Sequence, residues 1–371
     1  VPDESRTFGM EGMSRQLGIY SSVGQLYTPQ DADQLMFYKE DKSGQILQEG
    51  INEAGGMADW IAAATSYANH GVAMLPFYIY YSMFGFQRIG DLAWAAGDMR
   101  ARGFLVGGTA GRTTLNGEGL QHQDGHSHLV AATIPNCITY DPTFAYELAV
   151  IVQDGMRRMH QEQEDVFYYL TVMNENYTHP AMPKGAEQGI IKGMYLFSEG
   201  KAKAAKGRVQ LLGSGTILRE SIFAAELLEK DFGIAADIWS VTSFNELRRE
   251  GLDAERWNML NPEAKQPRVS YVEQCLGKRQ GPVIAATDYM KAYADQIRAF
   301  MPKHYKVLGT DGFGRSDTRK KLRGFFEVDR YYITVAALKA LADEGTIPAS
   351  EVSKAIKLYK INPDKPNPTT V

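Results

Sequence analysis

The pattern of apolar and polar positions changes repeatedly along most of this chain, between one typical of buried strands and one typical of helices. Short apolar or aromatic runs typical of buried strands alternate with longer stretches in which apolar residues recur at helical spacing. The runs that predict strands are 73–80, 103–107, 166–173, 209–212, 235–241, 283–286 and 305–308. The stretches that predict helices are 55–69, 86–101, 143–160, 217–232 and 289–300. This alternation is typical of parallel sheets covered by helices, so we expect an α/β fold with two doubly wound open-sheet domains.

A segment rich in breakers separates the two series of elements. His179-Pro-Ala-Met-Pro-Lys-Gly185 resembles the composition of domain linkers. We therefore predict two domains, at 1–182 and 183–371. Nearer the start, Thr28 and Pro29 have the residue types of a helix N-terminus, which predicts a helix to about Glu40.

Composition and charge narrow the class of protein. The 371 residues are 44% hydrophobic and 23% charged, as in ordinary globular proteins. A net charge of -4 gives no strong field for nucleic acid or an anionic membrane, so we expect neither partner. Cys137 and Cys275, far apart in sequence, favour a reducing compartment such as the cytoplasm. The start has neither an initiator Met nor an apolar signal core, so we expect a piece of a longer protein. The longest apolar stretch, 74–86, is interrupted by polar residues and is too short to span a bilayer, so we expect a soluble protein.

The densest polar segment, 116–128, holds three of the seven histidines: His122, His126 and His128. It is a Gly-rich loop between α/β elements, where open parallel sheets place ligand sites. Three interpretations remain open. The histidines could bind a metal, although their spacing matches no standard zinc pattern. They could perform acid–base catalysis on an anionic substrate, or the loop could only tie two domains together.

Two further segments are candidates for chemistry. Glu49 and Glu53 lie around a turn that enters an Ala-rich helix. A carboxylate there often interacts only with the helix dipole, but burial would raise its pKa and make it a proton donor. The aromatic run 78–88 passes from a strand into a helix, and such runs form core more often than a ligand platform. None of the three segments is decisive by itself.

Together and in this order, the three segments resemble the transketolase-like superfamily of thiamine-diphosphate enzymes. In that superfamily a Gly-Ile-x-Glu motif, here Gly50-Ile-Asn-Glu53, opens a helix of the pyrimidine domain. An aromatic residue follows the next strand, and a Gly-Leu-x-x-x-Asp-Gly-x-x-His-like loop, here 119–128, comes later. Residue by residue, the sequence is most similar to the bacterial homodimeric pyruvate dehydrogenases, and the similarity runs through essentially its whole length.

The resemblance implies a thiamine-diphosphate pyrimidine-binding domain, followed by a transketolase C-terminal-like domain that binds no cofactor. It implies that Glu53 hydrogen-bonds a ring nitrogen of the cofactor's aminopyrimidine and that Phe84 stacks on that ring. It also implies that Tyr81, His122 and His128 lie near the pyruvate-derived group. The activity would be oxidative decarboxylation of pyruvate, with transfer of the two-carbon product to a lipoyl group of the dihydrolipoyl acetyltransferase component by a homodimer.

The chain departs from the family in one respect. The Gly-Asp-Gly…Asn motif that binds Mg²⁺ and the diphosphate is not found: 89–92 lacks the second glycine, and 310–314 has no suitable Asn after it. We therefore expect the Mg²⁺ ligands in an absent N-terminal domain and no activity from this chain alone. The alternatives are a transketolase-type carbon-transfer enzyme and a catalytically inactive dimerisation or interaction module.

Overall fold

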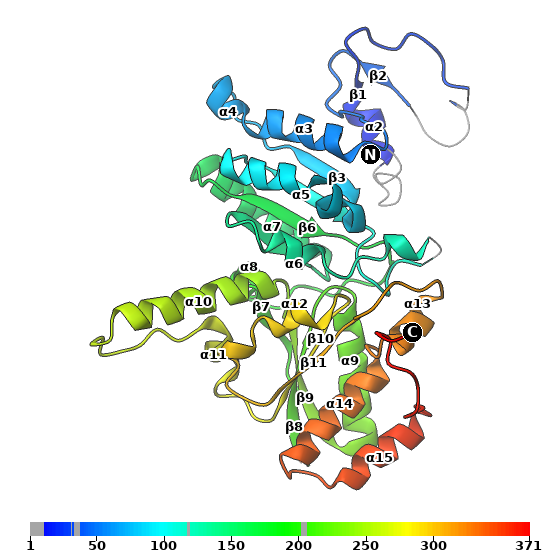
Figure 1. Ribbon diagram of the computed structural model, residues 1–371, viewed down its shortest axis with the longest axis vertical. Helices are drawn as coiled ribbons and strands as arrows, with labels where there is room; N and C mark the ends of the chain where they lie inside the picture. Colours follow the sequence, from blue (N-terminus) through cyan, green and yellow to red (C-terminus); the bar gives the residue numbers. More distant parts are fainter. Residues whose placement is uncertain (1–10, 31, 33–37, 117–118, 202–205) are drawn as a thin grey trace.

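The computed structural model describes residues 11–30, 32, 38–116, 119–201 and 206–371, and they form an elongated molecule with two large sheets and a small two-stranded sheet (Figure 1). Of the two large sheets, the first along the chain lies in the upper half of the view, and the second lies below it. The α/β architecture expected from the sequence is confirmed.

The first sheet is parallel throughout, with strand order β3-β4-β6-β5. Its strands are β3 (Phe77–Tyr81), β4 (Phe104–Gly108), β5 (Cys137–Tyr140) and β6 (Phe167–Thr171). All residues of β5 and β6 are buried, because helices cover both faces. Helices α3 (Glu53–Ala64) and α5 (Ser82–Asp98) pack on one face, and α7 (Ala145–Met156) packs on the other.

The second sheet has strand order β11-β10-β8-β9-β7. Its strands are β7 (Met194–Ser198), β8 (Gly207–Gly213), β9 (Ile234–Val241), β10 (Val283–Ala286) and β11 (Tyr305–Leu308). Strand β7 is antiparallel to β9, and the other pairs are parallel. One face is covered by α9 (Ile217–Leu227), α14 (Arg330–Asp343) and α15 (Ala349–Leu358), and the other by α10 (Phe244–Leu260), α11 (Tyr271–Leu276) and α12 (Lys291–Asp295).

Shorter elements connect these layers. They are α2 (Glu11–Leu17), β1 (Ile19–Tyr20), β2 (Glu40–Asp41), α4 (Ser66–Asn69), η1 (Leu120–His122), α6 (Ser127–Ala131), η2 (Arg157–Gln161), α8 (Glu187–Lys192), η3 (Leu228–Phe232), η4 (Arg298–Phe300) and α13 (Arg319–Phe325). Both η2 and η3 are π-helical turns that continue an α-helix.

The carboxyl ends of strands from the two sheets face each other. Asp141, directly after β5, donates its backbone N–H to Thr242 O after β9 (2.8 Å). Asp288, after β10, accepts hydrogen bonds from the backbone N–H groups of Thr113 (2.8 Å) and Thr114 (3.1 Å), which follow β4. The carboxyl edge of an open sheet is where α/β proteins bind ligands. In the second sheet, this edge is therefore covered at these positions by loops that follow strands of the first sheet.

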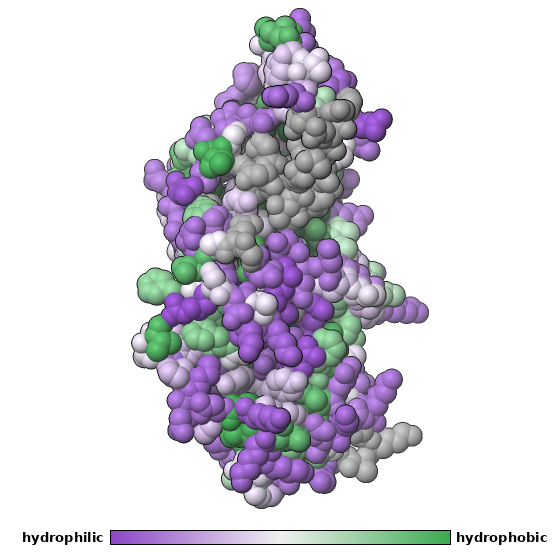
Figure 2. All heavy atoms as spheres, turned by 90° about the vertical axis from the view of Figure 1, so that its right-hand side faces the viewer, coloured by the Kyte–Doolittle hydropathy of each residue, from purple (hydrophilic) through white to green (hydrophobic). Residues whose placement is uncertain are grey.

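Hydrophilic side chains dominate the face shown in Figure 2, and hydrophobic residues appear there as scattered patches. Within the described part of the chain, no helix has the length and apolar character needed to cross a membrane. Most of the apolar stretch 74–86 forms strand β3 and the start of α5.

The described elements differ from the sequence-based expectations in several places. Strands β5 and β7 and helix α10 were not predicted. The helix expected from Thr28 to about Glu40 is wrong at its described ends, because Thr28 is irregular and Glu40 pairs in strand β2. Residues 31 and 33–37 of that expected helix lie outside the described residues.

Candidate active site

Glu53 is fixed at the N-terminus of α3. Asn52 caps the helix by accepting a hydrogen bond from the backbone N–H of Gly55 (3.1 Å). The hydroxyl of Tyr78, on strand β3, donates to the backbone oxygen of Glu53 (3.1 Å). The Glu53 side chain is 13% exposed. A carboxylate is therefore held with little exposure to solvent at the end of α3 that contacts strand β3.

Tyr81 and Phe84 lie at the junction between β3 and α5. Tyr81 is the last residue of the strand, and Phe84 lies in the first turn of the helix, with ring centroids 6.4 Å apart. The ring of His122 lies edge-on to both, 5.2 Å from Tyr81 and 4.8 Å from Phe84. The structure thus brings together three of the predicted site residues from segments about forty positions apart.

Arg88 completes this cluster, and the sequence analysis did not single it out. It lies one helical turn after Phe84, and its guanidinium carbon is 4.4 Å from the centroid of that ring. The same guanidinium donates to Glu53 Oε1 at 2.5 Å. A carboxylate and an aromatic face therefore converge on one planar group that carries N–H donors. The spacing of four between Phe84 and Arg88 was the available signal, but the ion pair with Glu53 spans 35 positions.

The aromatic run around these residues divides between core and site. Tyr78, Tyr80 and Phe86 are buried in the cluster that joins α3, α5 and the sheet. Tyr81 and Phe84 instead face His122. The core interpretation therefore applies to one part of the run, and the ligand-platform interpretation to the other.

Asp124, which is fully buried, organises part of the segment 116–128 with its three histidines, called here the histidine-rich loop. Its Oδ1 accepts the backbone N–H groups of His126 (2.9 Å) and Ser127 (3.0 Å) and so organises the start of α6. His126 Nε2 lies 3.0 Å from Gln87 Nε2 on α5. Among the described residues, no group of three His, Cys, Asp or Glu side chains could hold a metal ion. The geometry of this loop thus gives no support to the metal interpretation.

His128 is buried in the core and is separate from the cluster of Glu53, Phe84 and His122. Its ring stacks on Tyr293 (centroids 4.9 Å apart), and its Nε2 lies 2.8 Å from Thr171 Oγ1. Burial lowers the pKa of His128 to about 4, against a smaller opposing effect of the Asp124 charge, so this imidazole is neutral at pH 7. Its expected place near the substrate stays a prediction.

Comparisons with known proteins identify the family to which the chain belongs. Residues 1–180 match the family described as the pyruvate dehydrogenase E1 component middle domain, and residues 193–329 match the transketolase-like C-terminal domain. The pyruvate dehydrogenase E1 component of Pseudomonas aeruginosa is 73% identical over 99% of this chain, and that of Escherichia coli K12 is 60% identical over 99%. The chain belongs to the pyruvate dehydrogenase E1 component family.

The chain covers only part of these E1 relatives: 42% of the Pseudomonas protein and 41% of the Escherichia coli protein. Solved structures agree on the fold. A transketolase from Leishmania mexicana superposes on 94% of this chain and 43% of its own, with a TM-score of 0.66 and 16% identity. A structure titled "Split gene transketolase, inactive beta4 tetramer" matches 92% of this chain and 98% of its own, with a TM-score of 0.58 and 13% identity. Membership of the E1 family implies thiamine diphosphate as the cofactor.

Proposed function

We propose that this chain is part of a thiamine-diphosphate-dependent pyruvate dehydrogenase and supplies the residues that hold the aminopyrimidine ring of the cofactor. The observation that carries the proposal is the convergence of Glu53 and the face of Phe84 on the guanidinium of Arg88. An aminopyrimidine is also planar and carries N–H donors. The same carboxylate and ring face would therefore suit it once the Arg88 side chain turns aside.

Each residue of the cluster has a proposed role. Glu53 would share a proton with a ring nitrogen, and Phe84 would stack on the ring through offset contact and apolar burial. Tyr81 and His122 would line the space next to the pyruvate-derived group, where His122 would hold or transfer a proton. His128, which is buried apart from this cluster, is proposed to lie near the same pyruvate-derived group. When bound, the cofactor supplies the electron sink for loss of carbon dioxide.

The proposed reaction is oxidative decarboxylation of pyruvate, with transfer of the two-carbon product to a lipoyl group of the dihydrolipoyl acetyltransferase component. The proposed assembly is a cytoplasmic homodimer. We propose that residues outside this chain hold Mg²⁺ and the diphosphate, since the sequence lacks the Gly-Asp-Gly…Asn motif and the relatives are longer. The division into domains at 1–182 and 183–371 is part of the same proposal. Transketolase-type chemistry is not favoured, because the curated relatives are E1 components.

The test is Glu53→Gln in the full polypeptide that carries this sequence. Glutamine keeps the size of the side chain but cannot share an acidic proton. Loss of one positioned acid–base group should lower kcat by ~10²-fold or more. Pyruvate decarboxylation with an artificial electron acceptor measures the rate, and a thiamine-diphosphate titration measures the affinity.

Glu49→Gln is the matched control, because Glu49 lies four residues earlier and is exposed. We expect it to change kcat by less than about threefold, since an exposed charge contributes little. Equal activity of Glu53→Gln and the unsubstituted protein would contradict the proposed role of Glu53. Absence of any pyruvate-dependent turnover in the unsubstituted protein would contradict the proposed function itself.

A second candidate function is that of an inactive assembly module. One observation favours it: the solved split-gene transketolase chain has nearly the extent of this chain, and its title describes an inactive tetramer. This candidate predicts that the 371-residue chain forms a defined oligomer and does not respond to thiamine diphosphate. Size-exclusion chromatography with light scattering, repeated with added cofactor and Mg²⁺, measures both properties. A cofactor-dependent change in mass or turnover by this chain would argue against the module.

A further inference from the structure

A turn of the C-terminal half, Gly312–Arg315, lies against the histidine-rich loop. The contact centres on Gln123, which is 2% exposed. Its Oε1 accepts the backbone N–H of Arg315 (2.8 Å), and its Nε2 donates to the backbone oxygens of Arg315 (2.9 Å) and Leu115 (3.0 Å). One amide side chain therefore ties the residue next to His122 to two separate backbone segments.

Close packing supports the same contact on both sides of Gln123. A Cβ on Gly314 would overlap the backbone oxygen of Leu120, so the turn approaches the loop as only glycine allows. Arg112 is 6% exposed and donates from its guanidinium to the backbone oxygen of Gly312. A Cβ on Gly125 would overlap that guanidinium. The loop therefore makes close contacts both before His122, at Leu120, and after it, at Gly125.

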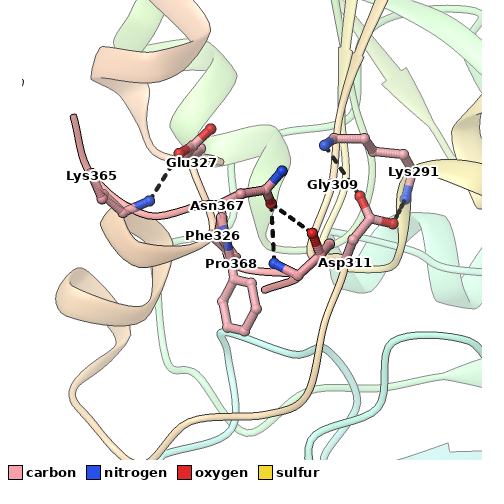
Figure 3. Close-up of a pocket in the computed structure, with 9 residues that line it drawn as sticks. Lys291, Gly309, Asp311, Phe326, Glu327, Lys365, Asn367 and Pro368 are labelled. Carbon is pink, nitrogen blue, oxygen red and sulfur yellow. Dashed lines mark hydrogen bonds and ion pairs between the residues drawn. The ribbon is translucent and has the colours of Figure 1, made fainter. Parts of the chain in front are cut away.

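The C-terminal tail holds the turn from its other side. Arg315 donates to the backbone oxygen of Val371, and a Cβ on Gly312 would come within 2.7 Å of Pro368 O. Residues of the tail line a cavity of about 170 Å³. Figure 3 shows Lys365 pointing toward Glu327 there, and the two side chains form an ion pair (2.9 Å). Lys365 also donates to the backbone oxygen of Phe325 (2.6 Å). The turn is therefore fixed between an anchored tail and the histidine-rich loop.

We propose that Gln123 is a positioning residue: it transmits the fixed place of the Gly312–Arg315 turn to His122 and so sets the imidazole against Tyr81 and Phe84. The inference rests on the proposed function of His122. A misplacement of about 1 Å in a reacting group can cost ~10²-fold in rate. A side chain with three hydrogen bonds to backbone atoms is suited to prevent such a shift.

The experiment compares Gln123→Leu with Gln121→Leu in the full polypeptide. Leucine is similar in size to glutamine but makes no hydrogen bonds, and Gln121 is the same residue type, exposed, two positions away. Hydrogen exchange of peptides over 115–126 reports how firmly the loop is held, without reference to activity. We expect Gln123→Leu to speed this exchange tenfold or more and to lower kcat about tenfold, with the KM for pyruvate nearly unchanged. Gln121→Leu should change neither quantity.

Gly314→Ala approaches the same contact from the opposite side and removes no side-chain hydrogen bond, so it provides a second test if Gln123→Leu folds poorly. It should also speed exchange over 115–126 and lower kcat. Exchange that is unchanged in both variants would overturn the proposal.

The route through His122 is tested by a double-mutant cycle. In a His122→Ala background, Gln123→Leu should lower kcat by less than threefold more, because the group that it positions is already missing. A full additional tenfold loss would overturn positioning through His122. If the unsubstituted protein does not decarboxylate pyruvate, the proposed function fails, and the exchange rates alone decide whether Gln123 holds the loop.

Discussion

Asp141 shows how strongly a single residue is affected by its place between the two sheets. It is fully buried, and burial raises the pKa of its carboxyl group to about 7. Hydrogen bonds from Thr171 Oγ1 (2.8 Å) and Tyr289 OH (3.2 Å) reach only Oδ1 and oppose this effect in part. The folded protein therefore holds a proton on Asp141 through much of the range in which an exposed Asp is ionised.

This proton predicts a specific pH dependence of stability. Because the pKa is higher in the folded state than the unfolded value near 3.8, the stabilising contribution is complete below about pH 4 and is lost as the pH rises through about 7. Asp141→Asn removes the ionisation and keeps the shape. The difference in unfolding free energy between the variant and the natural sequence should shift in favour of Asn by up to ~4 kcal/mol from pH 4 to pH 8.

Urea unfolding at several pH values measures that difference. Comparing the two proteins at each pH cancels the opposite effect of His128, whose lowered pKa is common to both. Parallel stability curves across pH 4 to 8 would mean that Asp141 ionises normally in the folded protein.

The residues of the candidate site were predictable only in part. Glu53, Phe84, Tyr81 and His122 came from motifs that resemble a known superfamily, and the structure brings them to one place. Arg88 was missed because Glu53 becomes its neighbour only when α3 and α5 pack on the same face of the sheet. Residue types and local spacing do not carry that information.

Helix α5 provides a prediction at the scale of one element. A Cβ on Gly85 would overlap the ring of Tyr80, which is fully buried and cannot turn aside, whereas Gly90 has open space around its Cβ position. Gly90→Ala should stabilise the protein by about 0.5–1 kcal/mol, because alanine is the better helix former. Gly85→Ala should destabilise it by about 1–3 kcal/mol through overpacking.

Chemical unfolding of the two variants measures both effects, and each serves as the control for the other. Equal changes in stability for Gly85→Ala and Gly90→Ala would show that the Tyr80 ring does not confine the helix.

Elements with a strong apolar pattern were predicted well, such as β8, β9, β10 and β11. Strand β5 was missed because Cys-Ile-Thr-Tyr is short and only its tertiary burial distinguishes it from a loop. Strand β7 was missed, and its antiparallel direction depends on pairing with β9 some forty residues later. The hydrophobic periodicity of a segment indicates which of its faces is buried. It does not indicate which other strand or helix the segment will contact.

At the scale of the whole molecule, Asp288 links the two sheets. Its carboxylate accepts from the backbone N–H and hydroxyl groups of both Thr113 and Thr114, all buried. Asp288→Ala removes the acceptor of both backbone N–H groups and of the Thr113 hydroxyl, and it should cost at least about 2 kcal/mol. Because the loss falls at the contact between the sheets, we expect one calorimetric unfolding transition to separate into two.

Asp253→Ala is the control for this prediction. Asp253 is exposed and pairs with Arg268 at 3.1 Å, and exposed pairs of this kind contribute about 0–1 kcal/mol. A single sharp transition in Asp288→Ala, shifted no further than in Asp253→Ala, would show that the contact does not couple the sheets.

The opposed carboxyl edges also affect how this protein tolerates sequence change. Loops that follow strands usually accept substitutions, because they lie on the surface. Here the segments around Thr113, Asp141 and Asp288 have the polar residues typical of loops, but these residues are buried. In a deep mutational scan, these loops should therefore be as intolerant as the apolar strands, and a rule that equates polar with replaceable would fail there first.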